Sequence, residues 1–239
     1  MNFLTETHTF TGPCGHLGTI RAFDLWELRK SREACIEGVA NIASLSYGNE
    51  AAKNPETLFK SIVDRGHLSC LEFVPFPYLG DGKPTLPSHS LRRYPSLVEA
   101  EYNFGEDNGE DDFPATAFLV ESPILTIRQW FRHRAFSYLE MSRRYTSGKK
   151  VPFEFYGADN AKEREAAHYA ESIALYDELC SWGEPPERAR RVIPVGAFSR
   201  FWAGGYNHDW KDSFTRLRSE KHAQTEIRLF SEFIQDIVK

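Results

Sequence analysis

The chain has 239 residues, of which 41% are hydrophobic and 14% aromatic, enough to bury a substantial core in a single domain. Its formal net charge is −5, so no overall positive field favours a nucleic acid as partner. No apolar run reaches 18 residues and the N-terminus lacks a basic leader. We therefore expect a cytoplasmic protein that is neither exported by a signal peptide nor inserted in a membrane.

The four cysteines are scattered along the chain and form no CxxC pair: Cys14, Cys35, Cys70 and Cys180. This spacing is typical of reduced thiols and predicts neither a disulfide framework nor a metal site. The segment Pro13-Cys14-Gly15-His16 suggests a Cys/His nucleophile. Two residues so close together in an N-terminal turn rarely face each other, so a turn residue is the favoured interpretation of Cys14.

Two helices are predicted in the first third of the chain. The first carries residues at helical spacing, Cys35, Val39, Ile42 and Ser46, and the second begins at Asn54-Pro55 and ends at Gly66. Directly after it comes Gly66-His67-Leu-Ser69-Cys-Leu-Glu72-Phe73. A histidine in this position is more often a cap or core-edge residue than a ligand.

Residues 79–113 are rich in turn-forming residues, and residues 101–112 carry six carboxylates without a basic residue. Such composition buries little apolar surface and predicts a loop with one short helix at 96–101. We expect an insertion between two strands that lies on the surface. Its acidic part would repel a phosphate, so it should lie away from any anion site.

The most informative segment is basic and follows an apolar run. Residues 117–127 are mostly apolar and lead through Arg128-Gln129-Trp130-Phe131 into residues 132–145, which hold four arginines, a histidine, a glutamate, two serines and two tyrosines. Arginine and serine are suited to binding phosphate. The alternative is a solvated basic helix face. A local positive site on an acidic protein favours a small anionic ligand.

The remaining third is predicted to be largely helical. Residues 151–156 are expected to be a short strand or extended segment, and a long helix spans about 161–182, before Pro185-Pro186. An arginine-rich stretch, an aromatic stretch at 198–202 and a turn at Gly204-Gly205 follow. A helix from about residue 209 and a last helix carrying His222 and Ile237 complete the chain.

The order Arg132-His133-Arg134-x-x-Ser137, followed by Glu140, Ser142 and Arg144-Tyr145, resembles the signature of the flavin-dependent thymidylate synthase family. Residues 66–73, and later Arg190, Asn207 and Arg218 with His222-Ala-Gln224-x-Glu226-Ile227, resemble other blocks of that family. Together the matching regions cover residues 40–77 and 114–235. Leu139 and Phe73 depart from the usual Asn and His.

The resemblance implies an α+β fold in which an antiparallel or mixed sheet is flanked by long helices. It implies one domain, 1–239, with the insertion at 79–113, which assembles as a homotetramer with shared active sites. The implied reaction is the C5-methylation of dUMP, with FAD as cofactor and methylenetetrahydrofolate and NADPH as cosubstrates. No GxGxxG motif is present, so FAD would not be bound as in Rossmann folds.

The resemblance also assigns roles by position. Arg218 would be catalytic, because its permanent charge stabilises negative charge that develops on the pyrimidine. The implied contacts with dUMP are Gln129, Arg132, Glu140, Ser142, Arg143, Arg144, Arg190 and Arg218. The implied contacts with FAD are Ser69, Arg132, His133, Arg134, Glu140 and Asn207. Arg143 stands where glycine is common, so we expect it to act through its backbone. We expect Ser142 to bind ligand and not to be a nucleophile.

Two alternatives remain open. A related C5-methylase that accepts UMP is kept open by Leu139 and by the insertion, because the ribose 2′-OH needs only a little extra room. An RNA-binding module would use the arginine and aromatic residues for phosphate contacts and base stacking. The acidic balance of the chain and its single basic patch count against this second alternative.

Overall fold

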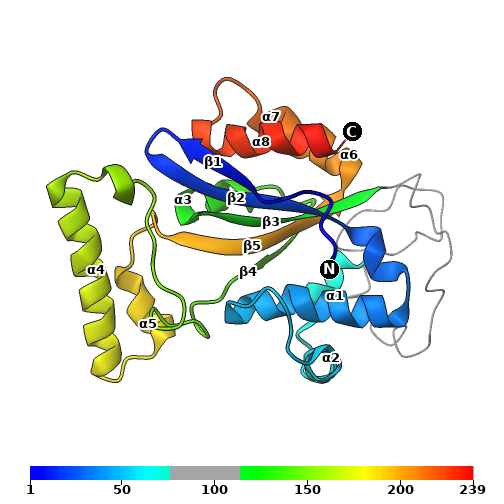
Figure 1. The fold of residues 1–239 in the computed structure, drawn as a ribbon, viewed down its shortest axis with the longest axis horizontal. Coiled ribbons are helices and arrows are strands. Elements are labelled where there is room, and N and C mark those ends of the chain that lie inside the picture. The colour runs from blue at the N-terminus through cyan, green and yellow to red at the C-terminus, as the bar shows by residue number, and fades with distance from the viewer. Residues whose placement is uncertain (76–113, 239) are drawn as a thin grey trace.

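A computed structural model describes residues 1–75 and 114–238 (Figure 1). The predicted insertion at 79–113, with its short helix and acidic segment, lies outside the described residues. The described residues form a five-stranded sheet with helices, so the predicted α+β class is confirmed. No helix among these residues is long and apolar enough to cross a membrane.

The sheet is entirely antiparallel, with strand order β1-β2-β3-β5-β4. The strands are β1 (His8–Gly12), β2 (Gly15–Asp24), β3 (Ala115–Pro123), β4 (Ser137–Glu140) and β5 (Phe198–Tyr206). The long central strands β3 and β5 pair over their full length, from Ala115 with Tyr206 to Pro123 with Phe198. Of the two sheet types predicted, the antiparallel one is present.

Each face of the sheet is covered by a different hydrophobic cluster. Alternate residues of a strand point to opposite faces, and in β5 Phe201 belongs to one cluster while Trp202 belongs to the other. Helix α1 (Arg32–Ser44) covers the face of Trp202, and helix α8 (Thr225–Ile237) covers the face of Phe201. Figure 1 shows α1 and α8 on opposite sides of the strands. The sheet is therefore buried on both faces.

The other helices agree well with the sequence. Helix α2 (Pro55–Asp64) has Asn54 as N-cap and Pro55 in its first turn, as predicted. The predicted helix at 161–182 is α4 (Glu163–Ser181), which lies beside α5 (Pro186–Ala189) at one end of the sheet (Figure 1). The remaining helical segments are α3 (Ile124–Trp130), α6 (Asn207–Asp209), the π-helical turn Trp210–Thr215, α7 (Arg216–Arg218) and the 3₁₀ turns Leu25–Arg29, Leu45–Tyr47, Leu68–Phe73, Ala158–Asn160 and Arg190–Val192.

Several local predictions are wrong. Gly204 and Gly205 form no turn but lie inside β5, because aromatic rings pack where a Cβ would stand. A Cβ on Gly204 would lie 2.6 Å from Phe73, and one on Gly205 would lie 2.4 Å from Phe136. Leu68–Phe73, where the strand before the insertion was expected, is a 3₁₀ helix. His222 precedes the last helix, which begins at Thr225.

The structure gives more detail for two further segments, the apolar run at 117–127 and the turn at Cys14. The apolar run at 117–127 divides at Pro123 into the end of β3 and the start of α3. Cys14 lies in the turn between β1 and β2, and its backbone N–H donates to the Tyr156 hydroxyl. His16 instead stacks on Phe198, with 5.5 Å between ring centroids. The interpretation of Cys14 as a turn residue is confirmed.

Candidate functional site

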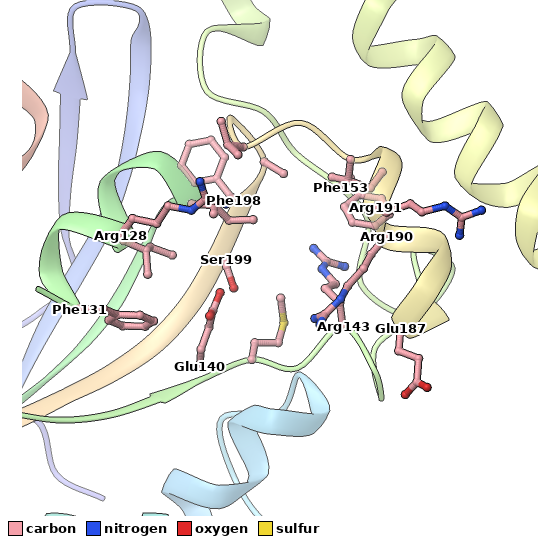
Figure 2. Close-up of a pocket in the computed structure, with 16 residues that line it drawn as sticks. Arg128, Phe131, Glu140, Arg143, Phe153, Glu187, Arg190, Arg191, Phe198 and Ser199 are labelled. Carbon is pink, nitrogen blue, oxygen red and sulfur yellow. The ribbon is translucent and has the colours of Figure 1, made fainter. Parts of the chain in front are cut away.

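A cavity of about 610 Å³, the main cavity, lies between α3, the end of β4, the start of β5 and the segment that follows α5 (Figure 2). Its volume is within the range of small-molecule sites. Aromatic rings from three separate segments, Phe131, Phe153 and Phe198, form part of its wall. Its charged and hydroxyl lining residues are Arg128, Glu140, Arg143, Glu187, Arg190, Arg191 and Ser199.

The charge of this cavity is positive, because four arginines line it against two glutamates. Figure 2 shows Arg128 on one side and Arg143 with Arg190 on the other, while Glu140 and Ser199 point toward each other between them. Burial raises the pKa of Glu140, and the Ser199 hydroxyl and the Arg190 charge partly oppose that rise. The arrangement suits an anionic ligand that also carries an apolar or aromatic part.

The Arg143 side chain is part of the cavity wall. Its guanidinium donates to the carbonyl oxygens of Val151 and Pro152 and lies over the Phe153 ring, 4.2 Å from the centroid. The side chain is buried, and burial lowers its pKa. That Arg143 contacts a ligand through its backbone stays a prediction, while its side chain holds the aromatic wall at Phe153.

Arg144 and Ser142 lie beside the cavity. The Nε of Arg144 is 3.2 Å from Glu187 Oε2, and its backbone N–H donates to Ser142 Oγ over 3.3 Å. Arg144 also lines a second cavity of about 380 Å³ together with Ser69 and Leu139. The rings of Tyr47 and Tyr145 meet in this second cavity with 5.0 Å between their centroids.

A third group of predicted residues surrounds Arg218. Its Nε donates to His133 Nε2 over 2.8 Å, and Nη2 donates to the Gln129 carbonyl oxygen over 3.1 Å. Burial, and then the charge of Arg218, lower the pKa of His133 to about 4. The imidazole is therefore neutral near pH 7 and accepts at Nε2, with Nδ1 facing Ser213 Oγ at 3.5 Å.

The predicted residues are thus not gathered in one place within a single chain. Glu140, Arg143 and Arg190 line the main cavity, Ser69 and Arg144 the second one, and Gln129 and His133 contact Arg218. Arg132 and Arg134 are exposed. Asn207 accepts from Thr116 Oγ1 over 2.8 Å, which ties it to β3.

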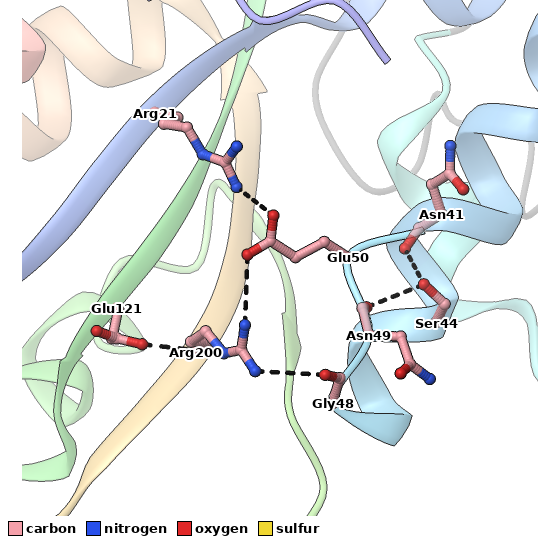
Figure 3. A network of polar contacts seen from close by, with 8 residues as sticks. All are labelled: Arg21, Asn41, Ser44, Gly48, Asn49, Glu50, Glu121 and Arg200. Carbon is pink, nitrogen blue, oxygen red and sulfur yellow. Dashed lines mark hydrogen bonds and ion pairs between the residues drawn. The ribbon is translucent and has the colours of Figure 1, made fainter. Parts of the chain in front are cut away.

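An ion-pair network holds the loop after α1 against the sheet (Figure 3). Glu50 pairs with Arg21 of β2 and with Arg200 of β5, and Arg200 also donates to the Gly48 carbonyl oxygen over 3.3 Å. From this loop, Ser46 accepts the backbone N–H of Ser142 over 3.2 Å. The network therefore holds the loop whose backbone contacts the basic segment at Ser142.

Several residues that line the main cavity were not predicted as site residues from the sequence: Arg128, Phe131, Phe153, Glu187, Arg191, Phe198 and Ser199. Three of these residues stand in or next to a basic stretch of the sequence. Arg128 and Phe131 directly precede the basic segment, and Arg191 belongs to the arginine-rich stretch after Pro186. Glu187 and Ser199 had none, because only the fold brings them to the cavity.

The described residues thus form an antiparallel sheet with an arginine-lined, aromatic-walled cavity that suits a small anionic ligand. The family model described as thymidylate synthase complementing protein matches residues 112–239. The chain belongs to this family.

Curated relatives are named flavin-dependent thymidylate synthases. The protein of Thermotoga neapolitana is 36% identical over 60% of this chain and 69% of its own length. That of Aquifex aeolicus is 32% identical over 54% of this chain and 47% of its own length. That of Pseudothermotoga lettingae is 28% identical over 74% of this chain and 87% of its own length. The chain therefore spans from about half to most of the length of these relatives.

Proposed function

We propose that this protein is an FAD-dependent enzyme that methylates dUMP at C5 to give dTMP. Methylenetetrahydrofolate supplies the carbon and NADPH the reducing equivalents, and the enzyme works in the cytoplasm. The observation that carries the proposal is the arginine-rich, aromatic-walled cavity in a chain whose relatives are named flavin-dependent thymidylate synthases.

The chemistry of the cavity fits a pyrimidine nucleotide. The phosphate would take Arg190 in the cavity wall and Arg144 beside the cavity, whose forked donors match phosphate oxygens. Glu140 and Ser199 offer a carboxylate and a hydroxyl within the cavity for the polar edge of the ring. Phe131 and Phe153 provide apolar surface for its faces.

The residues present also fit a flavin dinucleotide, although one chain does not bring them together. Exposed Arg132 and Arg134 suit a pyrophosphate, and exposed Ser69 opens on the second cavity, beside two tyrosine rings. When bound, reduced FAD supplies the hydride for the transferred carbon. Because Ser69, His133 and Asn207 lie in separate places, we propose that a homotetramer joins the parts of each site from neighbouring subunits.

In this proposal Arg218 stabilises the negative charge that develops on the pyrimidine. Its guanidinium is held by neutral His133 and by the Gln129 carbonyl oxygen, so its direction is fixed before substrate arrives. Preorganised donors of this kind need no rearrangement during the reaction. His133 serves as a positioning residue and keeps no proton on Nε2.

The two alternatives receive no support from particular contacts. Leu139 lines the second cavity and packs against the hydrophobic core, away from the main cavity that would take the ribose. An RNA surface could use the exposed side chains of Arg132 and Arg134, but those of His133 and Arg143 are buried.

Flavin content and nucleotide preference test the proposal together. Purified protein is expected to show flavin absorbance and to bind dUMP more tightly than UMP. Tighter binding of UMP would instead favour the related methylase. A colourless protein that takes up no added FAD and binds neither nucleotide would contradict the proposal.

A further inference from the structure

Glu187 places a carboxylate at the arginine-rich side of the main cavity. It lies in α5, lines the cavity and pairs with Arg144, with 3.2 Å between Oε2 and Nε. Figure 2 shows it beside Arg143 and Arg190. The other carboxylate of the cavity, Glu140, faces Ser199 between the two basic sides. Glu187 is therefore the acidic group closest in place to the proposed phosphate contacts.

Glu184, three residues earlier, differs from Glu187 in its position relative to the cavity. It pairs with Arg188 at 3.0 Å and with Arg191 at 3.7 Å, but it is not among the residues that line the cavity. Among residues 1–75 and 114–238, no ion pair engages Arg190 or Arg128. Of the two acidic residues in this segment, only Glu187 combines an arginine partner with a place in the cavity wall.

Carboxylate and phosphate oxygens compete for the same guanidinium donors. The side chains of Arg144 and Glu187 are 56% and 49% exposed, so solvent weakens their pair and a competing anion displaces it readily. A phosphate that binds Arg144 at Nε replaces this carboxylate, and one that binds at its Nη atoms lies close to the negative charge of Glu187. Each additional phosphate charge increases that repulsion.

We propose that Glu187 is a specificity-determining residue: it occupies Arg144 in the free protein and limits the ligand to a single phosphate. This inference rests on the proposed function, which makes Arg144 a phosphate contact. It predicts that the wild-type protein rejects nucleoside diphosphates through charge and not through lack of space.

The test compares three probes, dUMP, dUDP and deoxyuridine, on the flavin-loaded protein by calorimetry at low and moderate salt. Glu187→Gln removes the charge and keeps the size of the side chain. Glu232→Gln makes the same change in α8, where Glu232 pairs with Arg228 at 3.8 Å and neither residue lines the cavity. The thermal midpoint of each variant checks that its fold is intact.

Glu187→Gln should bind dUMP about two- to fivefold more tightly, as the loss of a competing exposed pair predicts. Its gain for dUDP should be larger, on the order of tenfold, and salt should reduce both gains. Deoxyuridine binding should not change, and Glu232→Gln should match wild type with all three probes. An unchanged or weaker affinity of Glu187→Gln for dUMP, or equal gains in Glu232→Gln, would overturn the inference. Failure of wild type to bind dUMP would instead contradict the proposed function.

Discussion

Arg218 donates from Nε to Nε2 of His133 across 2.8 Å, a contact that an imidazolium could not accept. The same guanidinium donates to the carbonyl oxygen of Gln129, near the end of α3. Residues 85 positions apart in sequence are thus joined, and the signature segment sets the direction of a distant arginine. The pair links a fixed positive charge to a histidine that stays neutral.

Replacement of Arg218 by lysine should separate charge from geometry. Lysine keeps a positive charge but loses the planar fork that reaches both His133 and Gln129. We expect the methylation rate to fall by about 10²–10³, the loss typical of a removed preorganised donor. FAD content, measured by absorbance, should stay unchanged. Turnover close to wild type would rule out the role assigned to Arg218.

The neutral state of His133 predicts a pH dependence of stability. Its pKa is about 4 in the folded protein, against 6.5 ordinarily, so the unfolded chain takes up a proton first as the pH falls. The free energy of unfolding should therefore decrease between about pH 6.5 and pH 4. His133→Gln keeps an acceptor for Arg218 without titrating, so its decrease over this window should be smaller. Denaturant titrations at several pH values measure both, and identical slopes would contradict the prediction.

Replacement of Arg143 by alanine should weaken the cavity wall. It leaves the carbonyl oxygens of Val151 and Pro152 without their donors and the Phe153 ring without its cation. We expect a loss of about 1–3 kcal/mol in the free energy of unfolding, together with weaker dUMP binding. Arg143→Lys should recover only part of both, because an ammonium lacks the planar fork. An alanine variant with normal stability and affinity would show that the side chain is dispensable.

The loop network makes a smaller prediction. Glu50→Gln removes the charge that pairs with both Arg21 and Arg200. Because the Glu50 side chain is 47% exposed, the expected loss is only about 0.2–1 kcal/mol for each pair, or a few degrees in Tm. Glu56→Gln is the matched control, since its single pair with Arg32 spans 3.7 Å at the surface. Equal effects of both substitutions would mean that the network has no special role.

Helices and their ends were predictable where the signals are local. Asn54 and Pro55 predict the start of α2, and the prolines at 185 and 186 follow the end of α4. The glycines of β5 were misassigned, because glycine ordinarily marks a turn and the rings that require it here, Phe73 and Phe136, come from elsewhere in the chain. No strand was predicted for β1 and β2, where a bulge after Phe10 breaks the regular register of the hairpin.

The residues of the candidate site were also only partly predictable from the sequence. The basic segment was evident from its composition, and Glu140, Arg143 and Arg190 do line one cavity. What the sequence does not contain is the partner of each group. Glu187 beside Arg144, Ser199 beside Glu140 and Val151 beneath Arg143 are pairings that only the tertiary fold makes.

The most direct test of the proposed activity is the mass of the nucleotide product. Flavin-loaded protein is incubated with dUMP, methylenetetrahydrofolate and NADPH, and the products are separated and weighed by mass spectrometry. We expect dTMP, formed only when all three are present and strongly reduced in Arg218→Lys. Unchanged dUMP in the complete mixture, with flavin and nucleotide both bound, would contradict it.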